Sequence, residues 1–365
     1  MDTLALLGST GSIGQTTLKV AKKFNIQAEL LVAGKNIELL NQQIQEFSPS
    51  FVVIADRNDL HRVESKNAKV FFGSEGIKEA LSLCSSSLVL NALVGFRGLE
   101  PTLHSIALGK QVALANKESL VTAGWLVDSS RLIPVDSEHF SLWHLLRNSK
   151  SFKSLLITAS GGAFRDTPLS LIPVQTPSNA LKHPNWSMGA KITIDSASMV
   201  NKLFEILEAF WLFGCTNINA LIEKKSLIHA LAEFSDGSMS AHLAKPDMAL
   251  AISYALNPSL ASQTSFLPQI SLSDLSSLSL EPIDTQRYPL WELKDKLLSN
   301  PKLGVVLNAS NEIAVERFLK EEFLFGKISE IVFESMTYFS SLPALQSLEE
   351  IRALDEEVRS FARGL

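Results

Sequence analysis

The sequence contains very little cysteine. Only two of its 365 residues are cysteine, Cys84 and Cys215, and neither belongs to a CxxC motif or lies near a Cys/His cluster. A disulfide framework needs several paired cysteines, and a thiolate zinc site needs a cluster of ligands. We therefore expect neither feature, and we expect a cytoplasmic protein because this composition suits a reducing compartment.

Long apolar runs and an excess of positive charge are also missing. No stretch approaches the ~20 consecutive apolar residues of a membrane-spanning helix, and the formal net charge is −5. These features argue against a membrane protein and against non-specific binding to nucleic acid or anionic lipid. A glycine turn already begins at Gly8, so we expect no signal or transit peptide.

What the sequence does contain is an alternation of strands and helices. Helix-like stretches such as Gln15–Phe24 and Leu39–Phe47 separate a series of short apolar runs. The predicted strands are Thr3–Leu7, Ala28–Ala33, Phe51–Ala55, Lys69–Phe72, Leu88–Asn91 and Gln111–Ala115. Such alternation predicts an α/β fold with a doubly wound, mainly parallel sheet. We place this Rossmann-like domain at residues 1–125.

The pattern changes after about Leu126. The predicted elements are a strand-like segment at Arg131–Phe140, strands at Leu155–Thr158, Leu227–Phe234 and Ser238–Ala244, and one long helix from about Ser196 to Phe213. They predict a central α+β domain at residues 126–258. Residues 259–286 are rich in Ser, Leu and Pro, as is typical of a linker. Helical patterns at Leu303–Lys320 and Ile328–Tyr338 predict a C-terminal helical bundle at residues 287–365.

A glycine turn, GSTGSIG at Gly8–Gly14, follows the first strand and opens a helix. Glycines permit a tight turn and close backbone approach, so amide N–H groups and the helix N-terminus can hold a pyrophosphate. Glycine patterns also occur in ordinary loops, but the position after the first strand of an α/β pattern favours a dinucleotide site. The second strand is followed by Gly34–Asn36, without the carboxylate of a typical NAD site, and Lys35 offers a cation to a 2′-phosphate. The sequence therefore favours NADPH.

Two carboxylates, Asp136 and Glu138, lie two residues apart in Pro134–Glu138. If this segment is extended, both project from one face and repel each other unless a cation lies between them. Oxygen ligands suit Mg²⁺ or Mn²⁺ rather than zinc. A solvated acidic strand end is the alternative, although apolar residues flank the pair on both sides.

Three further motifs combine polar residues with turns or a helix. Ser160–Gly162 follows a strand and could present a hydroxyl and amides to a phosphate, or be a plain turn. The loop His183–Gly189 could close over a ligand, although a loop histidine is more often structural. Asn201, Lys202 and Glu205 share one helix face. They form either a surface ion pair or a grip on a polyhydroxylated phosphate.

Taken together, these motifs resemble the 1-deoxy-D-xylulose 5-phosphate reductoisomerase family. The matching stretches occur in the family's order and cover nearly the whole chain: LLGSTGSIG, VAGKN, ALANKESLV, PVDSEHF, TASGGAF, HPNWSMGAKITIDSASMVNK and NASNEIAV. The resemblance implies an NADPH domain, a central catalytic domain with the dimer contact, and a C-terminal helical domain. It also implies a homodimer that converts 1-deoxy-D-xylulose 5-phosphate into 2-C-methyl-D-erythritol 4-phosphate, a step of the non-mevalonate isoprenoid pathway.

The resemblance also implies roles for individual residues. It assigns NADPH binding to Thr10, Gly11, Ser12, Ile13, Gly34, Lys35, Asn36, Asn116, Glu118 and Gly189. It assigns the divalent metal, Mg²⁺ or Mn²⁺, to Asp136, Glu138 and Glu205, which with Lys117 form the catalytic set. It assigns the phosphorylated deoxyketose to Lys117, Ser137, Glu138, Ser160, His183, Trp186, Ser196, Asn201, Lys202 and Glu205.

One stretch departs from the family pattern. Glu223–Ser226 reads EKKS where the family usually has His-Pro-Gln-Ser. This departure touches none of the assigned residues, and it leaves the role of that strand end open. The sequence also leaves open whether the metal is Mg²⁺ or Mn²⁺, and whether the rearrangement proceeds by retro-aldol cleavage or by a concerted shift.

Two other functions would use the same glycine turn. One is a different NADP-dependent oxidoreductase, such as a semialdehyde dehydrogenase, which needs no metal and in its acylating form needs a reactive cysteine. Neither Cys84 nor Cys215 is placed for that role in the predicted elements. The other is a non-enzymatic NADP-binding redox sensor, which has no use for the polar set Asp136, Glu138, Lys202 and Glu205.

Lys35→Ala tests the assignment of the cofactor. Because Lys35 is the one cation at the end of the second strand, its loss should raise KM for NADPH more than KM for NADH. Steady-state kinetics with each cofactor gives both values. Equal effects on the two cofactors would remove the argument for a 2′-phosphate contact.

Overall fold

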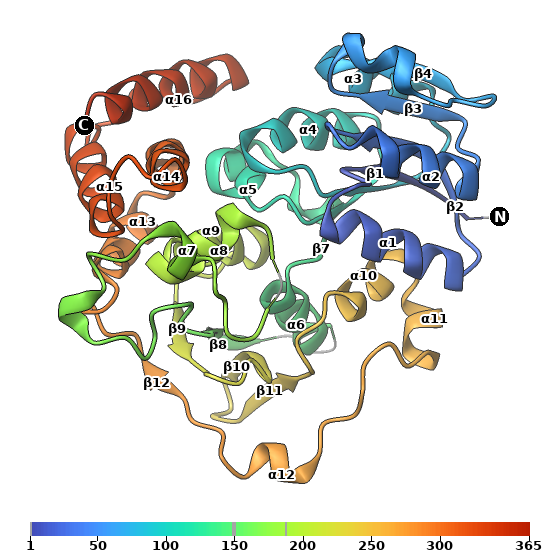
Figure 1. The fold of residues 1–365 in the computed structure, drawn as a ribbon. Coiled ribbons are helices and arrows are strands. Elements are labelled where there is room, and N and C mark those ends of the chain that lie inside the picture. Colours follow the sequence, from blue (N-terminus) through green and yellow to red (C-terminus); the bar gives the residue numbers. More distant parts are fainter. Residues whose placement is uncertain (1, 148–150, 187) are drawn as a thin grey trace. The chain divides into compact units, whose positions relative to one another are not determined.

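The computed structural model describes residues 2–147, 151–186 and 188–365 (Figure 1). It divides into two compact units, each built from separate stretches of chain. The first comprises Met1–Ser119, Val127–Phe140 and Asp247–Pro268, and the second comprises Leu120–Leu126, Ser141–Pro246 and Gln269–Leu365. No helix in the described part of the chain is long and apolar enough to cross a bilayer.

A seven-stranded parallel sheet forms the centre of the first unit, in the order β4-β3-β2-β1-β5-β6-β7. Its strands are β1 (Thr3–Leu7), β2 (Gln27–Ala33), β3 (Phe51–Ile54), β4 (Lys69–Phe72), β5 (Leu88–Asn91), β6 (Gln111–Leu114) and β7 (Leu132–Pro134). The six predicted strands of this domain are confirmed. The strand order reverses at β1, where Leu7 lies opposite Val32 on one side and Asn91 on the other. Ligands of doubly wound sheets bind outside the carboxyl ends of the strands at such a reversal, and the glycine turn follows directly after β1.

Alternating side chains along the strands explain why helices cover both faces of this sheet. Leu4 and Leu6 of β1 join one buried cluster with side chains of α1, α2 and α10, whereas Ala5 and Leu7 join another with α3. Successive residues of a strand point to opposite faces, so each face needs its own cover. The helices of this unit are α1 (Ser12–Lys23), α2 (Ile37–Phe47), α3 (Gly73–Leu83), α4 (Leu99–Ala107), α10 (Ala249–Leu256) and α11 (Pro258–Gln263). Helices α5 (Glu118–Ala123) and α6 (Ser137–Leu146) each begin in the first unit and end in the second.

The second unit contains a five-stranded mixed sheet in the order β11-β10-β8-β9-β12. Its strands are β8 (Phe152–Ala159), β9 (Ile218–Ile222), β10 (Ile228–Phe234), β11 (Met239–Leu243) and β12 (Glu281–Pro282). Its helices are α7 (Pro177–Ala180), α8 (Ala190–Ser198), α9 (Val200–Phe213), α12 (Leu272–Leu275), α13 (Lys294–Ser299), α14 (Gly304–Leu319), α15 (Gly326–Tyr338) and α16 (Leu348–Arg363). Ile194 of α8 and Phe318 of α14 belong to one buried cluster, so the C-terminal helices share a core with the segment around α8. The division into residues 126–258, 259–286 and 287–365 stays a prediction.

The strand predicted at Arg131–Phe140 is wrong in its second half. Strand β7 ends at Pro134, and α6 begins at Ser137. The N-terminus of a helix carries a partial positive charge that favours nearby carboxylates, and Asp136 and Glu138 flank this helix start. The two carboxylates therefore lie on a helix turn and not on one face of a strand.

The single long helix predicted from about Ser196 to Phe213 is also wrong. Met199 has a φ of 69°, and this left-handed residue separates α8 from α9. An L-residue in this conformation ends the helix before it and allows the next one to leave in a new direction. Periodicity alone could not find the break, because Met favours helices and its side chain is buried here.

A buried glutamate fixes the segment between α3 and β5. The carboxylate of Glu29 accepts hydrogen bonds from the backbone N–H groups and the hydroxyls of Ser85 and Ser86, and from the Cys84 thiol. Nearby, Lys110 Nζ donates to the carbonyls of Cys84 and Ser86, both at 2.7 Å. Burial raises the pKa of Glu29, but the hydrogen bonds from Ser86, Ser85 and Cys84 outweigh it and hold the pKa at about 2.

Glu29→Gln should destabilise the protein in a pH-dependent way. The pKa of Glu29 rises from about 2 in the folded chain to its ordinary 4.5 on unfolding, so its stabilisation is complete above pH 4.5 and is lost as the pH falls toward 2. Urea unfolding at neutral pH should give a free energy of unfolding that is about 2 kcal/mol lower for the variant than for the native chain. This difference in free energy should disappear as the pH falls below 4. The control is Glu46→Gln, since Glu46 is exposed and forms an exposed ion pair with Lys22. A difference in unfolding free energy that stays constant with pH would contradict the low pKa of Glu29.

Candidate active site

The glycine turn after β1 packs tightly against the backbone around it. Gly8 has a φ of 89°, and a Cβ placed there would lie 2.6 Å from Ala92 O; a Cβ on Gly14 would lie 2.2 Å from Gly8 O. Both positions therefore require glycine because of contacts within the protein. Gly11 is different, since its nearest neighbour would be 3.5 Å away and it is exposed at the start of α1, where no side chain caps the helix. This exposed helix start suits an anionic group.

The other cofactor candidates of the first unit divide into exposed and buried residues. Gly34–Asn36 is exposed after β2, and Asn36 caps α2 by accepting from Leu39 N at 3.1 Å. Asn116 is buried and its side-chain amide lies 2.9 Å from both Leu93 O and Glu118 Oε2. Its side chain is thus committed to the protein, which leaves mainly its backbone for a ligand.

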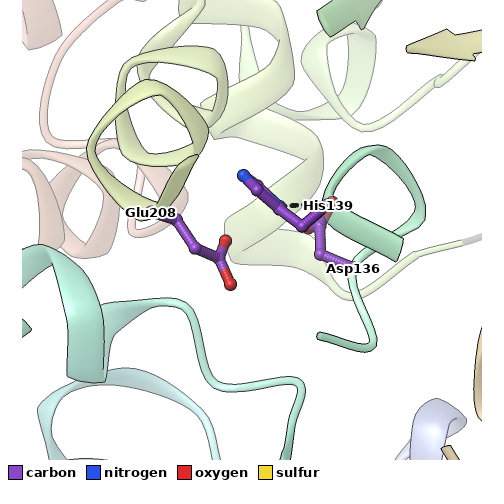
Figure 2. A group of neighbouring side chains, drawn as sticks. All are labelled: Asp136, His139 and Glu208. Atoms are coloured by element: carbon purple, nitrogen blue, oxygen red, sulfur yellow. Dashed lines mark ion pairs between the residues drawn. The ribbon is translucent and has the colours of Figure 1, made fainter. Parts of the chain in front are cut away.

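Asp136 and Lys117 form a buried ion pair in the first unit. Lys117 Nζ lies 2.7 Å from Asp136 Oδ2. His139 Nδ1 lies 3.4 Å from Asp136 Oδ1, and Figure 2 shows these two side chains. Burial alone would raise the pKa of Asp136, but the Lys117 ammonium and His139 hold it well below its usual range. Asp136 is therefore an anion at neutral pH. Sequence reasoning missed the fully buried His139, although its spacing of three from Asp136 fits one helical turn.

Ser137 and Glu138 form the first turn of α6. The Ser137 hydroxyl donates to Glu138 Oε2 at 2.5 Å, and Glu138 N donates to Asp136 Oδ1 at 3.3 Å. Both residues are half-buried. The structure thus gathers Asp136, Ser137 and Glu138 around one helix start.

A second acidic group lies on α9 in the second unit. Lys202 and Asn201 each donate to a different oxygen of the Glu205 carboxylate. Lys202 and Glu205 are 3% and 1% exposed, so the alternative of a solvated surface ion pair is wrong. Glu208, one turn further on and drawn in Figure 2, is also 1% exposed. A helix that buries charges needs partners for them, because an uncompensated buried charge costs several kcal/mol.

The chemistry of these donors fits a divalent cation with oxygen ligands. Asp136, Glu138 and Glu205 offer carboxylates only, and none of the three lies beside a cysteine. Mg²⁺ and Mn²⁺ prefer such hard oxygen ligands, whereas zinc prefers His and Cys.

Ser160 and His183 are joined directly in the second unit. The Ser160 hydroxyl lies 2.9 Å from His183 Nε2, and His183 Nδ1 accepts from the N–H groups of Asn185 and Trp186 at 3.2 and 2.9 Å. Because Nδ1 accepts twice from backbone, the ring proton is on Nε2 and donates to Ser160. Burial, helped by Arg165, lowers the pKa of His183 to about 4, so the ring is neutral at physiological pH.

The turn after β8 packs directly on α8. Gly162 has a φ of 65°, and a Cβ there would lie 2.7 Å from Ser196 O, so this glycine lets Ser160 and Ser196 come close in the fold. Gly162 N also donates to Ser160 Oγ at 3.1 Å. The structure thus joins Ser160 and His183 and packs the turn that follows Ser160 against the backbone of Ser196.

Tyr288 and Arg165 support this turn and were not found from the sequence. Tyr288 Oη donates to Gly161 O at 2.8 Å, and Arg165 Nη1 donates to Ser160 O at 3.1 Å. Burial raises the pKa of Tyr288 to about 12. Arg165 is five residues from Ser160, but Tyr288 joins the turn from a distant segment, which no local pattern could reveal.

Trp186 and Gly189 occupy the loop before α8. The Trp186 ring meets the His229 ring edge to face, with centroids 6.2 Å apart. Gly189 is the exposed residue that precedes the first turn of α8. Between them, Ser187 lies outside the described residues.

Comparison with known proteins decides the family. Three family models match consecutive parts of the chain: 1-deoxy-D-xylulose 5-phosphate reductoisomerase over residues 4–124, its C-terminal domain over 132–213, and the DXP reductoisomerase C-terminal domain over 243–361. The chain belongs to the 1-deoxy-D-xylulose 5-phosphate reductoisomerase family.

Relatives that carry this family's name match over their whole length. The chain is 57% identical to the 1-deoxy-D-xylulose 5-phosphate reductoisomerase of Helicobacter pylori (strain P12) over 359 residues, which are 98% of each chain. It is 57% identical to that of Wolinella succinogenes over 363 residues, which are 99% of this chain and 100% of the relative. The resemblance seen in the motifs is thereby confirmed.

Solved reductoisomerase structures share the fold. A crystal structure of DOX-P reductoisomerase in complex with NADPH, fosmidomycin and magnesium has a TM-score of 0.90 at 32% identity, covering 100% of this chain and 98% of that one. The Zymomonas mobilis reductoisomerase in complex with NADPH has a TM-score of 0.87 at 32% identity, with the same coverage. The predicted α/β fold with a Rossmann-like first domain is therefore confirmed.

Proposed function

We propose that this chain catalyses the NADPH- and divalent-metal-dependent conversion of 1-deoxy-D-xylulose 5-phosphate into 2-C-methyl-D-erythritol 4-phosphate in the non-mevalonate isoprenoid pathway. The observation that carries this proposal is the match, at 57% identity, across 98% of both chains. The polar residues that the reaction needs are all present in the matched motifs. The chain is thus an NADP-dependent oxidoreductase and isomerase.

For NADPH we assign the glycine turn and the end of β2. The helix start at Thr10–Ile13 would hold the pyrophosphate, and Gly34–Asn36 would hold the 2′-phosphate side of the adenosine through Lys35. Asn116, Glu118 and Gly189 complete the assigned set. The required glycines at positions 8 and 14 and the uncapped, exposed start of α1 support this assignment.

For the metal we assign Asp136, Glu138 and Glu205. All three are carboxylates, each is half-buried or buried, and Asp136 and Glu205 already carry lysine partners. When bound, NADPH supplies a hydride and the metal supplies Lewis acidity toward the substrate's oxygens. Mg²⁺ and Mn²⁺ both suit this donor set.

For the substrate we assign the residues around Ser160, His183 and α9. Ser160, Ser196, Asn201 and Lys202 would bind the phosphate, and the remote binding energy of that group would help order the loop that carries His183 and Trp186. Lys117 is placed beside Asp136, where its ammonium can hold a proton for the substrate's oxygens. Ser137 and Glu138 complete this set on α6. A loop closed over the substrate would exclude water from a reactive aldehyde.

We further infer a cytoplasmic homodimer with no nucleic-acid or membrane partner. Two buried free cysteines and a net charge of −5 support this view. The family resemblance supports the dimer.

A spectrophotometric assay tests the proposed function. The purified chain should oxidise NADPH only when both the deoxyketose phosphate and Mg²⁺ or Mn²⁺ are present. Equal turnover without metal would indicate a different oxidoreductase. Binding of NADPH without any turnover would indicate a redox sensor.

Glu138→Gln tests the metal assignment. Gln keeps the size of Glu but removes the charge that neutralises the ion, so kcat/KM at saturating Mg²⁺ should fall by on the order of 100-fold. Glu79→Gln is the matched control, because Glu79 is exposed and forms an ion pair with the exposed Lys69. Unchanged turnover of Glu138→Gln would show that the metal assignment is wrong.

A further inference from the structure

The departing stretch Glu223–Ser226 forms a tightly built turn between β9 and β10. Glu223 is 1% exposed, and its carboxylate accepts from the N–H groups of Lys225, Leu227 and Ile228 at 2.9, 2.6 and 3.2 Å. Three backbone donors on one buried carboxylate fix the course of the chain here. Glu223 therefore shapes the turn.

This turn binds the loop that precedes α8. Asn185 Nδ2 donates to Lys224 O at 2.8 Å and to Ser226 Oγ at 2.7 Å. Arg165 Nη1 donates to the same Lys224 carbonyl at 2.7 Å. Side-chain hydrogen bonds thus hold the loop at Ser160 through His183 and at the turn through Asn185, in addition to the ring contact of Trp186 with His229.

The two lysines of the turn also make specific bonds. Lys225 Nζ donates to Asp274 O at 2.9 Å and to Ser277 Oγ at 2.6 Å, while Lys224 Nζ pairs with Asp166 at 3.3 Å. Both contacts tie the turn to neighbouring segments of the same unit. The turn is therefore a fixed support on which the loop rests.

We propose that the turn Glu223–Ser226 is the docking point of the active-site loop, with Asn185 as its positioning residue. The role that we give to this docking in substrate binding rests on the proposed function, in which the loop covers the substrate. A loop that is already docked loses less conformational entropy when substrate binds. Asn185 acts through the position of His183 and Trp186 and does not need to touch the substrate.

Hydrogen exchange measured by mass spectrometry on the ligand-free full chain tests the docking. Asn185→Ala removes both bonds to the turn, so the amides of His183, Asn185 and Trp186 should exchange about fivefold faster. Asn179→Ala is the matched control, because Asn179 lies on α7 and its side chain bonds Gln175 and Lys182. Exchange of the same three amides in this control should equal that of the native chain. Equal exchange in Asn185→Ala and the native chain would overturn the proposal.

Two more variants distinguish loss of docking from a non-specific loss of stability. Asn185→Asp keeps the size but loses the donor, and Glu223→Gln disturbs the turn, so both should speed exchange in the same segment. If Glu223→Gln fails to fold, Asn185→Asp carries the test alone, and native-like exchange in it would overturn the proposal.

Kinetics then links docking to the reaction. Asn185→Ala should raise KM for the deoxyketose phosphate about fivefold while kcat changes less than about twofold. Absence of turnover in the native chain would refute the proposed function but leave the exchange result standing, so the two failures are distinguishable. An unchanged KM together with faster exchange would refute the catalytic purpose of the docking.

Discussion

The charge balance of buried carboxylates is the constraint on which the site depends. In the first unit Lys117 and His139 surround Asp136, and in the second Lys202 and Asn201 hold Glu205. An ionised carboxylate removed from water costs several kcal/mol unless a cation and hydrogen bonds compensate it, and hydrophobic residues would often be as stable in its place. Burying such a carboxylate–lysine pair costs free energy, so it needs a functional reason. Binding of a divalent cation is one such reason, because it requires ionised carboxylates.

The fold supplies these groups from the ends of its regular elements. The glycine turn leaves β1 where the strand order reverses, Asp136 follows β7, and Ser160 follows β8. Strand ends and helix starts offer free backbone amides beside rigid supports, so a side chain placed there is exposed to a ligand but held firmly. The loop before α8 is also held at strand ends. His183 bonds Ser160 after β8, and Asn185 bonds Lys224 and Ser226 after β9.

Much of this arrangement follows from the sequence, because strands of a parallel sheet are short apolar runs that local patterns reveal. The glycine turn and the strands of the first unit were predicted in this way, whereas the roles of the catalytic residues came from the family resemblance. The helix start at Ser137 and the break at Met199 were not, since both depend on tertiary contacts that override local propensity. His139, Tyr288 and Asn185 escaped because their roles rest on partners that only the folded chain brings near. The structural role of the turn at Glu223 escaped because its residues differ from the family pattern.

Anomalous diffraction from crystals grown with Mn²⁺ tests the proposed metal site. We propose that Asp136, Glu138 and Glu205 together hold one divalent cation. We therefore expect a single manganese peak per chain, in contact with carboxylate oxygens of all three residues. A peak bound elsewhere, or contacts to none of the three, would contradict it.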